Sequence, residues 1–406
     1  LMSSLLSASF DTLIPGVTEG GVAALPASAS CVVVSEPDEA ERLRPAWSAL
    51  LEHCDRIELT QSPEWLLTWW RVYGGLQGRR LRLGLFHDDG RLIGLAPLLR
   101  RRHWYGGGLP FRRLELLASG EPSAHGIYSN HLRVLAARGA EEQVAGSLVR
   151  AITEGAFGGW DEVVLPMMSG DTPLPGLLAD AFRAAGVSSE LTVMARAPYV
   201  ALPTAWDAYL QRLSANSRRN IHRSLKAWDA WAGGPAQLEV VRDLAGLEKA
   251  KEVLVQLHHA RWASDGQCGV FRSPLYLQFH DTLMRRLLER GALELLWLRA
   301  HDEPVAVFYG MVWAGKTYAY QMGRRIDLPG HLRPGAVLLA LAIRRAIEAG
   351  RREFDLLADE AFYKLQLASQ SRPLVQLRAA RNCLLEGVRQ GAKAIRARLR
   401  RLAARD

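Results

Sequence analysis

An uninterrupted run of apolar residues spans 336–343, directly after the pair Pro334-Gly335. Charged residues appear only towards the end of this segment, and Gly350 follows, a residue type that often ends helices. A short apolar stretch at 354–357 comes next and leads into a polar, aromatic cluster at 359–364. The pattern predicts a loop, a buried helix, a short strand and then a polar site.

Two further segments alternate as β-hairpins do. The strands expected are 81–86 with 92–99, and 293–300 with 304–313, and a third strand at 316–322 extends the second hairpin. Each hairpin turns through acidic residues, and each second strand begins with small residues. This weak repeat predicts two related α/β halves.

The remaining pattern divides the chain into four parts. Acidic residues interrupt the apolar positions of 1–30, so this part is predicted to be a disordered leader. Helical and strand patterns alternate through 31–202 and restart near 203, which makes 203–378 the second half. The last part, 379–406, has the spacing of a basic amphipathic helix.

Composition and charge narrow the function classes. A chain of 406 residues with 49% hydrophobic and 23% charged residues is typical of a globular protein with two domains. Its four cysteines lie far apart, which predicts no disulfide framework, no metal site and a reducing cytoplasm. The net charge of +9 favours anionic partners such as CoA, nucleotide-sugars, nucleic acid or anionic lipid. Motifs of serine hydrolases, zinc proteases and P-loop or dinucleotide-binding proteins are absent from the sequence.

The start of the predicted buried helix is a candidate anion site. The amides of Gly335, Ala336 and Val337 would lie at its N-terminus, where unpaired N–H groups and the helix dipole favour a pyrophosphate. Arg333 precedes them and would add a charged hydrogen bond. An ordinary crossover helix would show the same spacing, so both interpretations stay open at this point.

The order of these features resembles the CelD-like family of GNAT-superfamily acetyltransferases, which is associated with cellulose and exopolysaccharide biosynthesis. The matching residues in the second half are Pro334-Gly335, 337–347, Gly350, Phe354-Asp355, Glu360 and Tyr363-Lys364; those upstream are 63–70, 94–98 and 216–221. The resemblance extends over roughly 60–366. It implies an α/β fold of tandem GNAT-like domains, each a mixed, mostly antiparallel sheet flanked by helices.

The resemblance also implies an activity. A CelD-like protein would transfer an acyl group from acetyl-CoA or another acyl-CoA to an amine or hydroxyl of a sugar or polysaccharide precursor. The alternatives are a Fem-type transferase, which has tandem GNAT-like domains and uses aminoacyl-tRNA, and a degenerate GNAT scaffold without activity. Only the second half has hairpin, strand, turn and helix in the GNAT order, so the intact cofactor site is expected there. The family commonly has an acidic residue where this chain has 128–131, which puts the acceptor in doubt.

Proton transfer and substrate binding need further residues. The candidates for catalysis are Asp355, Glu360, Tyr320 and Tyr363, and the candidates for substrate binding are Lys364, Arg219 and Arg223. Each has a structural alternative. Tyr320 would serve equally as core packing in a strand, Glu360 and Lys364 have the spacing of a helical ion pair, and the two arginines would suit a solvated helix face.

The C-terminal segment 380–405 combines apolar residues at helical spacing with many arginines. Such a helix packs on its own domain, lies on an anionic membrane or contacts nucleic acid. The sequence therefore predicts a cytoplasmic protein, or one peripheral to the inner face of the membrane. Contact with tRNA is expected only for the Fem-type alternative.

Overall fold

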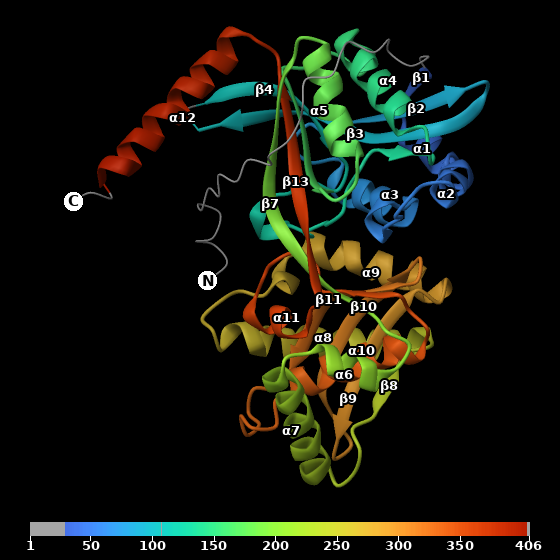
Figure 1. Ribbon diagram of the computed structural model, residues 1–406, viewed down its shortest axis with the longest axis vertical. Helices are drawn as coiled ribbons and strands as arrows, with labels where there is room; N and C mark the ends of the chain where they lie inside the picture. Colours follow the sequence, from blue (N-terminus) through green and yellow to red (C-terminus); the bar gives the residue numbers. More distant parts are fainter. Residues whose placement is uncertain (1–28, 107, 404–406) are drawn as a thin grey trace.

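A computed structural model describes residues 29–106 and 108–403, which form one 13-stranded sheet with helices packed around it (Figure 1). The strand order is β1-β2-β3-β4-β6-β13-β7-β12-β11-β10-β9-β8, and β5 pairs with β3. Most neighbouring strands are antiparallel, and β4–β6 and β11–β12 are parallel. The predicted mixed, mostly antiparallel α/β architecture is confirmed.

The strands are β1 (Ser30–Val34), β2 (Arg80–Asp88), β3 (Arg91–Tyr105), β4 (Leu109–Leu116), β5 (Leu135–Ala136), β6 (Glu162–Ser169), β7 (Ser188–Ala201), β8 (Leu238–Val240), β9 (Leu293–Ala300), β10 (Glu303–Trp313), β11 (Lys316–Arg324), β12 (Glu353–Asp355) and β13 (Gln370–Ala380). The helices are α1 (Pro37–Arg42), α2 (Arg44–Glu52), α3 (Pro63–Tyr73), α4 (Glu141–Thr153), α5 (Leu174–Ala184), α6 (Trp206–Arg212), α7 (Ala215–Ala232), α8 (Leu244–Ala263), α9 (Pro274–Glu289), α10 (Pro334–Glu348), α11 (Phe362–Leu367) and α12 (Leu384–Ala403).

Both predicted hairpins are present, as β2–β3 and β9–β10. Each half also contains a parallel strand pair with a basic residue opposite an acidic one: Arg113 faces Glu162 between β4 and β6, and Lys316 faces Glu353 between β11 and β12. The side chains of each pair form an ion pair, at 2.7 Å and 3.4 Å respectively. The two halves therefore repeat the same plan down to a charged cross-strand pair.

The strand β13 joins the two halves. It follows α11 in the second half, yet it lies between β6 and β7 and pairs with β7 from Gln370 to Ala380 (Figure 1). On its other edge, β7 pairs with β12. A single sheet therefore runs through both halves, and 203–378 supplies most of one strand to the sheet built mainly from 31–202.

The ends of the chain differ from the predicted bounds. Most of the predicted disordered leader, 1–28, lies outside the described residues, but Ala29 is buried and Ser30 begins β1. At the other end, 379 and 380 belong to β13, so the predicted helix begins only at Leu384. No helix in the described part of the chain is both long and apolar enough to cross a membrane.

The helix α10 is buried against β9 and β10, as its continuous apolar run predicts. Val337, Leu338 and Ile343 are fully buried in a core shared with Leu296 and Phe308. Pro334 occupies the first turn, where its missing N–H costs no hydrogen bond. Buried apolar contacts hold the helix in place, and its N-terminus lies beside Arg324 at the end of β11.

Candidate active site

The strands β11 and β12 separate after a short parallel pairing. Their pairing covers Lys316 to Tyr318, whereas β11 continues to Arg324 and the chain after Asp355 turns away into α11. On its other edge, β11 has a bulge, because Tyr309 faces Gln321 and Gly310 faces Ala319, which leaves Tyr320 without a partner in β10. A bulge re-aims the backbone of its extra residue. Tyr320 therefore lies where the sheet opens.

A small pocket lies at this opening, between the two halves. Its lining residues are Leu59, Thr60, Trp65, Tyr128, Asn130, Met311, Tyr318, Tyr320 and Leu357. Five of them come from the first half: from the 3-10 turn before α3, from the first turn of α3 and from the loop before β5. No periodic pattern in the sequence points to these residues, although segment 128–131 departs from the family pattern.

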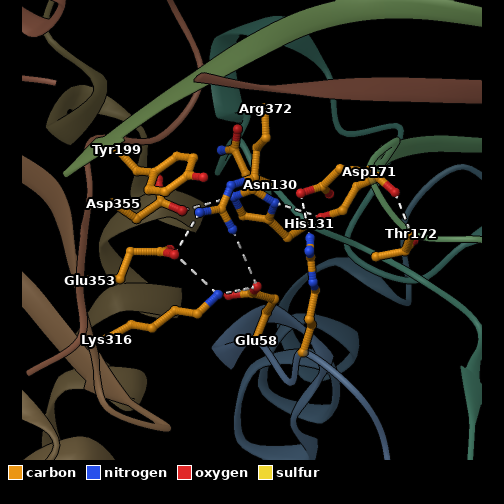
Figure 2. A network of polar contacts seen from close by, with 12 residues as sticks. Glu58, Asn130, His131, Asp171, Thr172, Tyr199, Lys316, Glu353, Asp355 and Arg372 are labelled. Carbon is orange, nitrogen blue, oxygen red and sulfur yellow. Dashed lines mark hydrogen bonds and ion pairs between the residues drawn. The ribbon is translucent and has the colours of Figure 1, made fainter. Parts of the chain in front are cut away.

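His131 and Asp355 form a buried pair across the two halves (Figure 2). Nε2 of His131 lies 3.0 Å from a carboxylate oxygen of Asp355, and Nδ1 lies 2.8 Å from Oγ of Ser169. Burial opposes the charge on both groups, but each stabilises the other's ionised form: the pKa of His131 is raised and that of Asp355 is lowered. The second oxygen of Asp355 accepts the amide of Leu357 at 2.7 Å. Asp355 thus fixes the loop behind the pocket and does not itself line the pocket.

The loop after Asp355 is held from both sides. Its residues Leu357 and Asp359 have positive φ angles of 60° and 91°, which few non-glycine residues adopt. The amide of Ala358 donates to Oδ1 of Asn130 at 3.0 Å, and Nζ of Lys364 donates to the carbonyl of Ala358 at 2.7 Å. Burial lowers the pKa of Lys364, while the carboxylates of Asp359 and Asp355 oppose this effect. A strained loop in the second half is therefore supported by an amide of the first half and by Lys364.

Glu360 and Lys364 do not form the ion pair that helical spacing offered as their alternative role. Glu360 lies on the surface, where its carboxylate is 3.5 Å from Arg196 and 3.3 Å from Oγ of Ser371. The hydrogen bonds of Lys364 go to the loop carbonyls. The residue spacing suggested a helix from Glu360 to Lys364, but α11 begins only at Phe362.

The tyrosines differ in their surroundings. Tyr318 donates to Glu58 at 2.5 Å, and Tyr320 donates to the carbonyl of Ile127 and lies 3.1 Å from Nε2 of His280. Burial raises the pKa of both phenols well above the ordinary value. Both phenols are therefore neutral near pH 7 and donate hydrogen bonds to these acceptors. Tyr363 is exposed on α11.

The amides at the N-terminus of α10 are arranged differently from the predicted anion site. The amides of Ala336 and Val337 donate to the carbonyl of Arg333, at 2.9 Å and 3.1 Å, so they are engaged within the first turn. Gly335 donates to no backbone acceptor in the part of the chain that the structure describes. Val337 is also fully buried. Neither the amide of Ala336 nor that of Val337 is therefore free for an anion, because both already donate to the carbonyl of the capping residue Arg333.

Arginines surround this turn. A Cβ on Gly335 would lie 3.2 Å from Cδ of Arg324, so the side chain of Arg324 passes directly over the glycine. Burial, and then the charge of Arg261 on α8, lower the pKa of Arg324. Arg333 is exposed beside them, and Arg261 is also paired with Asp265. A free amide under a cluster of guanidinium groups fits a pyrophosphate.

Arg219 and Arg223 lie elsewhere. Both are exposed on α7, and Arg223 donates to the amide oxygen of Asn220 at 2.6 Å. Neither lines the pocket between the halves. α7 packs against α10 instead, and its first turn borders a second groove with α11, lined by Arg212, Leu213, Ser214, Asn216, Ser217, Phe362, Leu365, Gln366 and Ala368.

The corresponding opening in the first half is closed. There β6 continues beyond its pairing with β4, and Leu132 forms a parallel bridge with Met168. Leu132 and Ile127 are buried. The chain itself thus occupies the position that is open beside β12. The same segment carries Asn130 and His131 into the site of the second half.

Comparisons with known proteins agree with this geometry. Residues 215–365 match the family model described as an acetyltransferase (GNAT) domain. This region is similar to GNAT acetyltransferase domains. It extends from α7 into α11 and therefore contains the opened strands, the bulge and the N-terminus of α10. The protein is accordingly an acyltransferase, as predicted.

The solved structure of FemX has the same fold over most of the chain. FemX is 12% identical and has a TM-score of 0.59, with 86% of this chain and 97% of that chain covered. The C-terminal domain of a putative lysylphosphatidylglycerol synthetase from Agrobacterium fabrum is 12% identical, with a TM-score of 0.49 and coverage of 86% and 93%. A tandem GNAT protein from the clavulanic acid pathway is also 12% identical, with a TM-score of 0.43 and coverage of 88% and 100%. A comparison with the sequences of curated proteins finds no match. The GNAT domain and the repeated strand plan support the predicted tandem GNAT-like fold.

Proposed function

We propose that the protein is an acyl-CoA-dependent N- or O-acyltransferase of CelD-like type, with its active site between β11 and β12. The observation that carries the proposal is the opening beside Tyr320, with the cluster of Arg324, Arg261 and Arg333 at one end and the shared pocket at the other. A CoA ester has a matching shape, with a pyrophosphate at one end and a thioester at the other.

Different residues of the chain would bind the cofactor, transfer a proton and hold the pocket wall. Arg324, Arg333 and the amide of Gly335 would bind the pyrophosphate. Bound acyl-CoA supplies a thioester that an amine or hydroxyl can attack. Tyr320 lines the pocket and would give its phenol proton to the leaving thiolate. Lys364 would hold the loop carbonyls, so that the wall of the pocket at Leu357 keeps its position.

The acceptor in this proposal is a sugar or polysaccharide precursor. The resemblance to the CelD-like family supports this class of acceptor. The aromatic rings of Trp65 and Tyr128 line the pocket and would pack against the apolar face of a sugar ring. Acyl-CoA and reduced thiols both point to a cytoplasmic location.

Calorimetric titration of the full chain with acetyl-CoA tests the proposal. We expect binding that added tRNA does not change and that Arg324→Ala weakens. The matched control is Arg344→Ala, an exposed arginine at the far end of α10 that pairs with Glu348. Failure of the chain to bind any CoA ester would leave only the alternatives below.

A Fem-type transferase is the second candidate. The likeness of the fold to FemX and the exposed arginines of α7 favour it. Such an enzyme would bind aminoacyl-tRNA, and the double substitution Arg219→Ala with Arg223→Ala would weaken this binding. Addition of acetyl-CoA would not change the binding of aminoacyl-tRNA. A degenerate scaffold would bind neither ligand.

A further inference from the structure

The C-terminal helix α12 stands apart from the body of the molecule. It follows β13, touches β4 near its start and then extends outwards (Figure 1). Its first turn is firmly attached: the buried carboxylate of Glu386 accepts hydrogen bonds from Arg378 at 2.7 and 2.9 Å and from Arg389 at 2.8 and 2.9 Å. These bonds hold the pKa of Glu386 well below its ordinary value despite burial. The helix is therefore a fixed arm.

One face of this arm is apolar and uncovered. Leu384 is 86% exposed, Val388 48% and Ile395 63%. Steps of four and seven residues bring these side chains onto one stripe of a helix. The sequence continues the same spacing at Leu399 and Leu402. Water-exposed apolar side chains at such regular spacing indicate a surface that is covered by something else.

The charge of the arm indicates what kind of surface binds it. Within Leu384–Ala403 the sequence has six basic residues, Arg389, Lys393, Arg396, Arg398, Arg400 and Arg401, and one acidic residue, Glu386. Because Glu386 is already neutralised by two arginines, the arm presents excess positive charge beside its apolar stripe. An occupant must therefore offer both negative charge and an apolar interior. An anionic bilayer has both, whereas nucleic acid lacks the apolar interior.

The neighbouring β3–β4 hairpin adds a related feature. Arg102 and Trp104 alternate on β3, both are exposed, and the guanidinium group of Arg102 lies 6.0 Å from the ring centre of Trp104. Tryptophan prefers the boundary between water and lipid, where its ring is apolar and its N–H is hydrated. Arg389 of α12 lies over the ring of Tyr105 on the same hairpin, so the hairpin and the arm are adjacent.

We propose that α12, with its Leu384/Val388/Ile395 stripe, is a docking surface for the anionic phospholipid of a membrane. The helix would lie in the plane of the interface with its apolar stripe among the acyl chains and its basic residues among the headgroups. The proposal goes beyond the acyltransferase activity, because none of the residues that line the pocket between the halves belongs to α12.

Sedimentation with vesicles tests the proposal on the full chain. We expect it to bind vesicles of phosphatidylcholine with 30% phosphatidylglycerol at least tenfold more strongly than vesicles of phosphatidylcholine alone. Binding should fall at 0.5 M salt, because salt screens the headgroup charge. The double substitution Leu384→Glu with Val388→Glu should reduce binding at least tenfold, and Lys393→Glu should reduce it several-fold. The control is Leu244→Glu on α8, which changes a leucine about as exposed as Val388 and should have no effect.

Three outcomes would overturn the proposal. The first is equal sedimentation of the double variant and the full chain. The second is the absence of vesicle binding together with a dimer that the double variant dissociates in analytical ultracentrifugation, since a second copy would then cover the stripe. The third is the absence of vesicle binding together with tRNA binding that Lys393→Glu weakens. Unchanged melting temperatures of the variants establish that they are folded, and unchanged acetyl-CoA binding separates this result from the fate of the proposed activity.

Discussion

At the scale of single residues, the pair His131–Asp355 links the two halves beside the pocket. Both side chains are almost completely buried and meet at 3.0 Å. A buried charge that loses its partner is costly, since neither water nor another group replaces the lost interaction. The pair therefore matters more for holding the loop at 357–358 than for adding net stability.

The shifted pKa values of this pair predict how stability depends on pH. The pKa of His131 is raised above 6.5 on folding, so its contribution is complete below pH 6.5 and is lost as the pH rises through the raised value. The pKa of Asp355 is lowered below 3.8, so its contribution is complete above that pH and is lost as the pH falls through the lowered value. We expect His131→Gln to destabilise the fold by about 3–5 kcal/mol near pH 5–6, and by less at pH 9. Urea unfolding at several pH values measures the difference; a difference that grows with pH would contradict the assignment.

Lys364 offers a second test at this scale. Its ammonium group binds the carbonyl of Ala358, and a methionine of similar length would leave that strained loop without a donor. We expect Lys364→Met to lower kcat/KM about 10–100-fold, since one charged hydrogen bond contributes about 1.5–3 kcal/mol. The control is Lys226→Met on the exposed face of α7. If the kinetics of Lys364→Met were unchanged, the assignment of Lys364 to the site would be wrong.

The sequence could identify one member of each contact but not its partner. Asp355 stood out because it lies in the short strand before the polar cluster and belongs to the matching pair Phe354-Asp355. His131 lies 224 positions away, and no local pattern connects it with Asp355. Glu360 was nominated as the acidic residue ahead of Tyr363-Lys364 in the resemblance, and it lies on the surface before α11 begins. Residues that reach the site from another element carry no periodic signal.

At the scale of elements, α10 shows how far an apolar pattern leads. The run at 336–343 predicts its position and its burial, and Gly350 predicts where it ends. The pattern did not reveal that Arg333 adopts a left-handed conformation and that its carbonyl engages two amides of the first turn. Gly335 is left as the free donor, and Arg324, from a different strand, becomes the charged neighbour.

This arrangement predicts the effect of changing the turn. Arg324→Ala should weaken acetyl-CoA binding about 10–100-fold, and Arg333→Ala should do so to a similar or smaller extent because Arg333 is more exposed. Fluorescence or calorimetric titration gives the dissociation constants. Arg344→Ala serves as the control on the same helix, and an equal effect of all three substitutions would indicate a general charge effect and no site at the turn.

At the scale of the whole molecule, buried ion pairs and a common sheet unite the two halves. Lys316 of β11 lies between Glu58 at 2.5 Å and Glu353 at 3.4 Å, and Arg372 of β13 binds Glu353 at 2.7 Å (Figure 2). Glu58 belongs to the first half and the other three to the second. Separating the halves would break these ion pairs, and a charge that stays buried without its partner is costly.

The halves should therefore unfold together. We expect one calorimetric transition whose van't Hoff and calorimetric enthalpies agree. Lys316→Met should lower the stability of the whole molecule by about 3–5 kcal/mol without creating a second transition, because Glu58 and Glu353 would both remain buried. Two separate transitions in the unmodified chain would show that the halves are independent.

Sequence patterns predicted the two hairpins, the repeated plan and the second half as the location of the open site. They did not predict that β13, which belongs to the second half in sequence, pairs with β6 and β7 of the first half. An alternating strand shows which of its faces is buried but not which neighbours it pairs with, since pairing depends on edges brought together by the whole fold. The closure of the first half by Leu132 escaped prediction for the same reason.

The position of β13 has a consequence for how the protein is made. Synthesis runs from the N-terminus, so β6 and β7 leave the ribosome long before Gln370–Ala380 is translated. At about 5–20 residues per second, about 10–30 s pass between the two events. During this interval β6 and β7 lack the strand that separates them, and their open edges are available to other chains. The nascent protein is thus a natural client for chaperones that shield strand edges until the last strand arrives.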